Sequence, residues 1–234
     1  MNKVMFFIIV FAVSNNLFAQ QKISYRTVIF ETVANGKMLF LKDSVYTNSF
    51  KETYTVSKLK YYVSNIRFVH TENNNIKKSV YLIDASKNNE LHVRFYGTKI
   101  KGISFLLGVD SLNNCTGAQS GALDPLNDMF WTWNNGYVMF KLEGKSDSSK
   151  ADNNRIEQHI GGYKGANKTM REIFLPLNEN YFNKHTNLTI QLNLDNYWKG
   201  LNEMHIAETP VITSPGEAAK TAADNFEGMF LIKK

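Results

Sequence analysis

Short segments in which apolar and polar residues alternate recur along most of the chain, separated by Asn, Gly, Asp and Ser. In residues 187–194, NLTIQLNL, the aliphatic side chains fall at every second position: Leu188, Ile190, Leu192 and Leu194. Successive side chains of a β-strand point to opposite faces, so this pattern predicts a strand with one buried face. The dipeptide Asn35-Gly36 stands between two such segments and favours a hairpin turn. We therefore expect an all-β fold, an antiparallel β-sandwich with one or two short helices.

Further strands are predicted where the alternation returns, at residues 79–84, 90–97, 101–109, 137–142, 155–162 and 171–177. Between residues 59 and 68 the alternation changes phase at Ser64-Asn65, which predicts a bulge or an irregular turn. Helical patterns are few. Asp195 is placed to cap one short helix, and Ser214-Pro215 before an alanine-rich segment predicts another. Sequence order does not specify which strands pair.

The N-terminal segment has the pattern of a targeting sequence. Lys3 precedes the apolar run Val4 to Val13, which is too short to span a bilayer, and Ala19 is a small residue at a cleavage position. We expect residues 1–19 to be a secretory signal peptide and residues 20–234 to form one domain that is secreted or periplasmic. A retained N-terminal anchor is the alternative. No later apolar run is long enough to cross a membrane, so we expect no span in the mature chain.

Charge and motif content argue against several classes of function. The chain has 27 Lys and Arg against 21 Asp and Glu, and its basic residues are scattered instead of forming a stripe. A nucleic-acid partner is therefore not expected. The sequence also lacks a Gly-rich phosphate loop, a His-Glu-x-x-His motif, a nucleophile elbow and a paired-cysteine motif. We expect a binding protein that is not an enzyme.

Two histidines are candidate metal ligands. His159 is predicted on the polar face of its strand, directly before Gly161-Gly162, and is either an exposed strand-end histidine or a ligand beside a glycine turn. His205 follows Met204, and this pair suits copper better than zinc because a thioether is a soft ligand; packing and surface roles are the alternative. The remaining histidines are expected at the surface: His70, His92 and His185.

The single cysteine, Cys115, cannot form an internal disulfide. It is an inert buried thiol, the half of an intermolecular bridge, or a soft metal ligand.

Residues 124–144, DPLNDMFWTWNNGYVMFKLEG, crowd aromatic and sulfur-containing side chains around Trp131 and Trp133. Large aromatic side chains supply much of the buried area of protein cores, so packing alone explains such a cluster. The alternative is that the tryptophans serve chemistry.

This block resembles the MbnP-like copper-binding proteins, which are β-rich secreted or periplasmic domains related to the methanobactin-associated protein MbnP. The shared elements follow one another along the chain: Gly108-Val109, Asn113-Asn114, Pro125-Leu126-Asn127, Met129-Phe130-Trp131-Thr132-Trp133, Gly136-Tyr137 and Glu143-Gly144. Weaker matches occur at residues 61–68, 159–163 and 222–230, so the resemblance spans residues 23–230.

The resemblance implies a protein that binds copper for uptake, storage or delivery. Members of the family bind the metal with histidines and with a tryptophan that is oxidised to kynurenine, a reaction attributed to a dihaem partner enzyme. Kynurenine offers the metal an aromatic amine and a carbonyl, which tryptophan lacks. The expected site residues are then His159 and His205 with Trp131 and Trp133 nearby, although Trp198 is also open as the oxidised residue.

The chain departs from the family pattern at one position. Where copper-binding members carry Asn-His, this chain has Asn114-Cys115. Either Cys115 replaces the histidine as a soft ligand or the copper site is lost. The alternative function is a metal-free cell-surface module on the same fold that binds a protein or a glycan.

Overall fold

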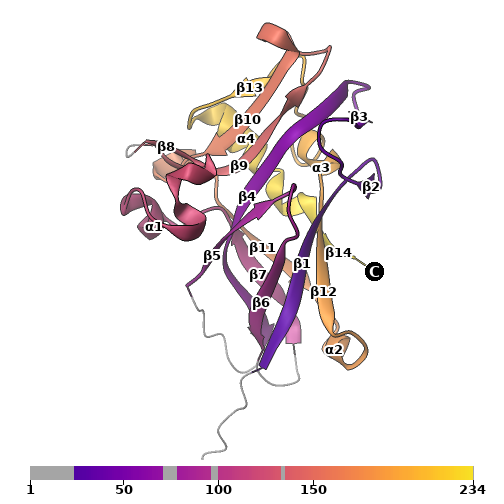
Figure 1. Cartoon of the computed structure of the whole chain (residues 1–234), viewed down its shortest axis with the longest axis vertical. Helices are drawn as coiled ribbons and strands as arrows, with labels where there is room; N and C mark the ends of the chain where they lie inside the picture. Colours follow the sequence, from indigo (N-terminus) through magenta and orange to yellow (C-terminus); the bar gives the residue numbers. More distant parts are fainter. Residues whose placement is uncertain (1–23, 71–77, 96–99, 133–134, 234) are drawn as a thin grey trace, which may run out of the picture.

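The computed structural model describes residues 24–70, 78–95, 100–132 and 135–233, which form two β-sheets packed face to face (Figure 1). The predicted signal peptide and Trp133 lie outside the described residues. One sheet has the order β14-β12-β1-β2, with β6 also paired to β1: β1 (Ser24–Ala34), β2 (Lys37–Met38), β6 (Glu90–Phe95), β12 (Asn187–Asn193) and β14 (Phe230–Ile232). The sandwich prediction is confirmed.

The larger sheet has the order β11-β7-β4-β9-β10-β13. Its main strands are β4 (Thr53–His70), β7 (Ile100–Leu107), β9 (Gly136–Lys145) and β10 (Arg155–Gly161), with β11 (Arg171–Pro176) at the edge beside β7. Shorter strands join them, with β3 (Val45–Thr47) and β5 (Val80–Asp84) on β4, β8 (Phe130–Thr132) on β9, and β13 (Val211–Ile212) on β10.

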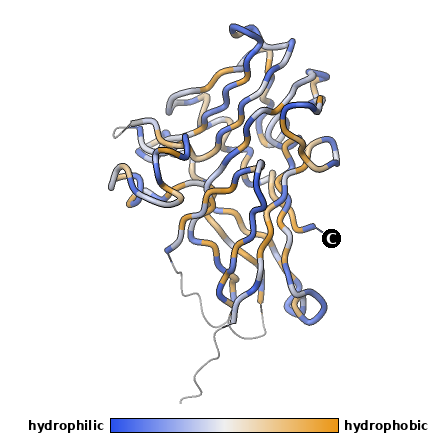
Figure 2. Tube along the Cα trace, in the orientation of Figure 1, coloured by the Kyte–Doolittle hydropathy of each residue, from blue (hydrophilic) through white to orange (hydrophobic). Residues whose placement is uncertain are grey.

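The main core fills the space between the two sheets. Hydrophobic and hydrophilic residues alternate along the strands (Figure 2), and the inward side chains of β12 and of the residue after it are fully buried, as the alternation predicted: Leu188, Ile190, Leu192 and Leu194. They face inward residues of the other sheet, among them Phe105 and Phe140. Burial of each large aliphatic or aromatic side chain contributes about 1.5 to 3 kcal/mol.

The two local irregularities predicted from the sequence are present. Asn35 and Gly36 both have positive φ, 50° and 69°, and they join β1 to β2 in a tight antiparallel hairpin. In β4 the pairing with β7 shifts register between Ser64 and Arg67, and Asn65 has a φ of 54°. The side chain of Ser64 donates a hydrogen bond to the carbonyl oxygen of Gly108, 2.5 Å away, at this bulge.

Two expectations about the strands and their residues were wrong in detail. The sheets are mixed, because β1 pairs in parallel with β12, and β10 in parallel with β13. Strands joined through long connections can pair in parallel, and the alternation of residues within one strand does not predict which strand it pairs with or in which direction. His70 is buried instead of exposed, with its ring centroid 5.5 Å from that of Phe95.

The described residues contain four short α-helices, more than the one or two expected: α1 (Ser111–Cys115), α2 (Tyr181–Lys184), α3 (Asp195–Trp198) and α4 (Glu217–Ala223). Helices α1 and α2 are too short to show periodicity. Five 3₁₀ turns accompany them: η1 (Gly121–Leu123), η2 (Pro125–Asn127), η3 (Asp152–Asn154), η4 (Gly165–Asn167) and η5 (Phe226–Met229). None of the helices in the described part of the chain has the length and apolar content needed to cross a membrane.

Candidate functional site

A second, smaller apolar cluster lies on the outer face of the larger sheet, opposite the main core. It forms where the segment from α1 to β8, seen at the left of Figure 1, folds over β4 and β9. Adjacent residues of β4 divide between the two sides, with Tyr61 in the main core and Tyr62 in the outer cluster. The block 124–144 contributes buried aromatic and sulfur-containing side chains to this cluster: Met129, Tyr137 and Met139.

Buried polar groups tie this segment to β9. Asn114 is 1% exposed; its amide nitrogen donates to the carbonyl oxygen of Val109 at 2.6 Å, and its amide oxygen accepts from the backbone N–H of Tyr137 at 3.0 Å. The hydroxyl of Tyr137 lies 2.7 Å from the carbonyl oxygen of Leu123. Since buried polar groups without partners are costly, these bonds hold the segment in one arrangement over the sheet.

Trp131 packs against the end of β10. A Cβ atom placed on Gly161 would lie 2.7 Å from Cζ3 of Trp131, so the indole ring approaches a position where only glycine leaves room. Trp131 belongs to the outer cluster, and His159 projects away from the main core two residues before Gly161. The indole of Trp131, which packs on Gly161, and the imidazole of His159 therefore lie on the same side of the sheet.

The imidazole of His159 is held by a carboxylate. Its Nε2 atom lies 2.9 Å from Oε1 of Glu143 on the adjacent strand β9, and its side chain is 15% exposed. The hydrogen bond from His159 lowers the pKa of Glu143 to about 2; burial opposes this shift, and Lys58 and Lys141 add to it. Lys58 Nζ lies 3.0 Å and Lys141 Nζ 3.8 Å from the carboxylate. Glu143 is therefore an anion at neutral pH.

The same two lysines also bind the segment that carries Trp131. Asp128 lies 2.7 Å from Lys58 Nζ and 3.1 Å from Lys141 Nζ, and Lys60 donates to the carbonyl oxygen of Asn127 at 3.1 Å. Asp128 adopts the left-handed conformation that ends η2, with φ of 61°. Burial opposes ionisation of Asp128, but hydrogen bonds from the two lysines hold its pKa below the usual value. One ion-pair network thus joins Glu143, which contacts His159, to Asp128, which lies in the segment that carries Trp131. We call Lys58, Asp128, Lys141 and Glu143 the clasp.

The other predicted site residues lie elsewhere. His205, after α3, stacks on Phe50 with ring centroids 3.8 Å apart, while Met204 beside it is buried in the main core. Cys115 is a free, exposed thiol on α1, so the buried-thiol alternative is wrong. Trp198 is fully buried in the main core. Among the described residues, no group of three or more His, Cys, Asp and Glu side chains is placed to hold a metal ion.

Sequence reasoning missed the clasp. Three of its members, Lys58, Lys141 and Glu143, lie among core residues on β4 and β9, a pattern typical of an ordinary polar strand face, and Asp128 lies in the loop after η2. Glu143 becomes the partner of His159 only through the pairing of β9 with β10, in which Lys141 stands directly opposite His159. The buried position of Lys141, 4% exposed, shows that this face is covered, and the sequence contains no pattern for it.

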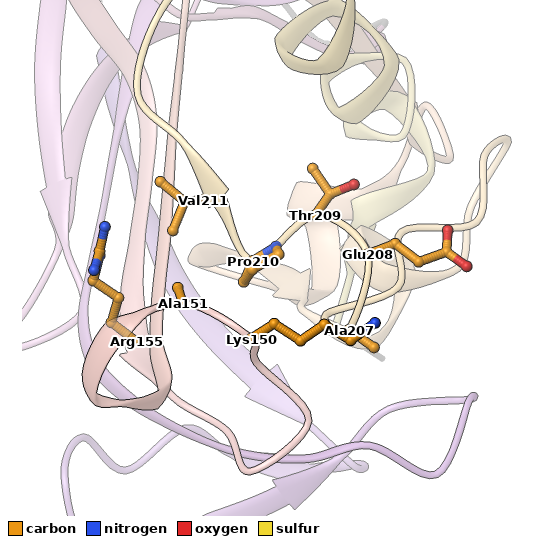
Figure 3. Close-up of a pocket in the computed structure, with 8 residues that line it drawn as sticks. All are labelled: Lys150, Ala151, Arg155, Ala207, Glu208, Thr209, Pro210 and Val211. Carbon is orange, nitrogen blue, oxygen red and sulfur yellow. The ribbon is translucent and has the colours of Figure 1, made fainter.

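An open pocket of about 480 Å³ lies near the other end of β10 (Figure 3). It is lined by Lys150, Ala151, Arg155 and residues 207–211. The guanidinium of Arg155 already lies 3.2 Å from Glu157 and 3.6 Å from Asp152, and Figure 3 shows it turned away from Lys150. None of the predicted site residues lines this pocket.

Comparison with known proteins supports the assignment of the fold. A model of the MbnP family matches residues 24–214. Among solved structures, MbnP from Methylosinus trichosporium is similar with a TM-score of 0.56 and 16% sequence identity, over 78% of this chain and 80% of that chain. At this identity the likeness shows a common fold. No curated protein matches the chain.

Proposed function

The chain belongs to the MbnP family, and on this premise we propose that it is a secreted or periplasmic copper-binding protein that takes up, stores or delivers the metal without catalysis. One observation carries the proposal. His159, held by Glu143, lies on the same side of the larger sheet as Trp131, which packs against Gly161 two residues further along β10. Trp131 is in the block that carries the family resemblance.

The chemistry of these residues is compatible with a copper ion bound by histidine and by kynurenine, as the family implies. Imidazole suits copper, and metal-binding histidines commonly donate their second ring N–H to a carboxylate; Nε2 of His159 lies within hydrogen-bond distance of the Glu143 carboxylate. An unmodified indole has only an N–H donor and no ligand atom for a metal. Copper would be held by His159 and, once Trp131 has been oxidised to kynurenine, by an amine or carbonyl of that side chain.

Of the two tryptophans that the structure describes, Trp131 has the environment that favours oxidation. Trp131 is partly exposed on the outer face, whereas Trp198 is fully buried between the sheets against Tyr54 and Tyr197. A partner enzyme of the dihaem class reaches a side chain at the surface more readily than one in the main core. The oxidation of Trp131 by such a partner, with dioxygen as the oxidant and with C2 of the indole released as formate by hydrolysis, is part of the proposal.

The second candidate is a metal-free cell-surface module that binds a protein or a glycan. Two observations favour it. The described residues contain no group of three His, Cys, Asp or Glu side chains placed to hold a metal, and two large apolar side chains stand exposed in the segment from α1 to β8, Leu112 at 61% and Leu126 at 93%. Exposed apolar residues on loops are common at contact surfaces.

Copper titration of the mature protein separates the two candidates. Protein purified from its own host is titrated with Cu(I) against a competing chelator, and intact mass with peptide mapping locates any tryptophan that has gained one oxygen and lost one carbon. We expect stoichiometric binding, modification at Trp131, and loss of binding in His159→Ala. His92→Ala is the matched control, because His92 is exposed on the other sheet. Unmodified protein that does not bind Cu(I) would favour the metal-free module.

A further inference from the structure

The contact between Glu143 and His159 determines which imidazole nitrogen carries a proton. Oε1 of Glu143 lies 2.9 Å from Nε2 of His159, and Oε2 lies 3.0 Å from Nζ of Lys58. A carboxylate held between ammonium groups is ionised and only accepts hydrogen bonds. Nε2 must therefore donate. In the neutral imidazole the other nitrogen, Nδ1, is then unprotonated and has a free lone pair.

We propose that Glu143 is a positioning residue that fixes His159 in the tautomer protonated at Nε2, so that Nδ1 is the nitrogen offered to a metal. The assignment of the tautomer stands on the geometry of this chain alone. The assignment of Nδ1 as the donor atom rests on the proposed copper site.

The clasp makes this arrangement rigid. Glu143 cannot turn toward solvent without leaving Lys58, and Lys58 and Lys141 are in turn held by Asp128. Lys141 is almost fully buried, and loss of either carboxylate would leave its charge poorly compensated. The position of the imidazole and the position of the Trp131 segment are therefore set by the same pair of lysines.

A metal bound at Nε2 would require a different arrangement. It would displace the hydrogen bond to Glu143 and bring a cation toward Lys58 and Lys141, which already flank the carboxylate. Binding at Nδ1 keeps every ion pair of the clasp in place and adds the usual support of a metal-binding histidine by a carboxylate.

The first test uses the copper-free protein and needs no substitution. The protein is labelled with ¹⁵N-histidine, and two-bond ¹H–¹⁵N correlation spectra are recorded at alkaline pH. His159→Asn identifies the resonances. We expect the pattern of a ring protonated at Nε2. A ring protonated at Nδ1 would overturn the proposal, whether or not the protein binds copper.

The second test compares Glu143→Gln with Glu157→Gln. Glu157 stands directly opposite Glu143 on β10 but pairs with Arg155, so it is a matched control on the same face. A Gln side chain both donates and accepts, and we expect His159 to lose its single tautomer in Glu143→Gln but to retain it in Glu157→Gln. Unchanged tautomers in both variants would refute the role of Glu143.

The third test adds Cu(I), which is diamagnetic, to the same labelled proteins produced in their own host, where the partner that oxidises Trp131 is present. We expect the Nδ1 resonance of His159 to move on binding, and Glu143→Gln to weaken Cu(I) affinity by roughly 10- to 100-fold while Glu157→Gln leaves it unchanged. A shift of Nε2 instead of Nδ1 would refute the donor assignment. Absence of Cu(I) binding in the wild-type protein would refute the proposed function together with the donor atom, while the first two tests still decide the role of Glu143.

Discussion

Replacement of Gly161 by alanine tests whether the ring of Trp131 packs against β10. The added methyl group would stand 2.7 Å from Cζ3 of Trp131 and 2.8 Å from the carbonyl oxygen of Tyr137. Favourable carbon–carbon contacts lie at about 3.5 to 4.0 Å, so the ring and the backbone are both too close by roughly 1 Å. Such overpacking costs about 1 to 3 kcal/mol. We expect Gly161→Ala to lose stability within this range and to shift the tryptophan emission as the ring is displaced.

The assay is urea unfolding followed by circular dichroism, which does not depend on the tryptophans. Gly228→Ala is the control, because a methyl group there meets no atom within 4 Å, and we expect it to change the unfolding free energy by less than about 0.5 kcal/mol. The decisive comparison is Gly161→Ala in a Trp131→Ala background. Removal of the ring should relieve about 1 kcal/mol of the penalty, leaving the contact with the Tyr137 carbonyl. An equal penalty in both backgrounds would show that Trp131 does not pack on Gly161.

Three further predictions concern buried or partly buried polar groups, each measured by urea unfolding. Glu52→Gln should lower the free energy of unfolding by about 1 to 3 kcal/mol. The carboxylate accepts from the backbone N–H groups of residues 206–207 at 2.8 and 2.9 Å, and the NH₂ group of a Gln side chain would face one of these N–H donors. An unchanged unfolding free energy would refute this. Gln158→Leu should cost at least about 2 kcal/mol, since it removes the acceptor of the Tyr197 hydroxyl, 2.8 Å away, and a donor to two carbonyl oxygens; stability equal to wild type would contradict it. Because the folded pKa of Glu143 is lowered from 4.5 to about 2, first through the hydrogen bond from His159, its stabilisation is present above pH 4.5 and is lost as the pH falls toward 2. The full shift corresponds to about 3 kcal/mol and screening reduces it to about 1 to 2 kcal/mol, so wild type should lose that much more stability than Glu143→Gln between pH 6 and pH 2.5; parallel pH profiles would rule it out.

The features that the sequence predicts well depend on neighbouring residues only. Alternation along β12, the Asn35-Gly36 turn and the phase change at Ser64-Asn65 each require a few adjacent positions, and each is found in the structure. The exposure of His159 on the polar face of β10 follows from the same alternation.

The features that the sequence does not predict depend on pairing. β1 and β12 are separated by more than a hundred residues, and their parallel register arises from the packing of the two sheets. The carboxylate partner of His159 is specified by the register of β9 with β10, which includes a shift between Ile160 and Gly161. A shift of one residue in that register would place His159 opposite a core position, so no count of polar residues along either strand identifies Glu143 as the partner.

Core packing and a chemical role were alternative explanations for the tryptophans, and the structure places the two that it describes in different environments. Trp198 is fully buried among Tyr54 and Tyr197, where its ring area contributes to the main core. Trp131 lies on the outer face against a glycine, in a segment held to the sheet by the clasp. A residue that served only to fill space would not need ion pairs involving a nearly buried lysine, because apolar side chains of similar volume stabilise as well or better. The clasp is therefore best explained by a requirement for position, and any chemistry of the block is expected at Trp131.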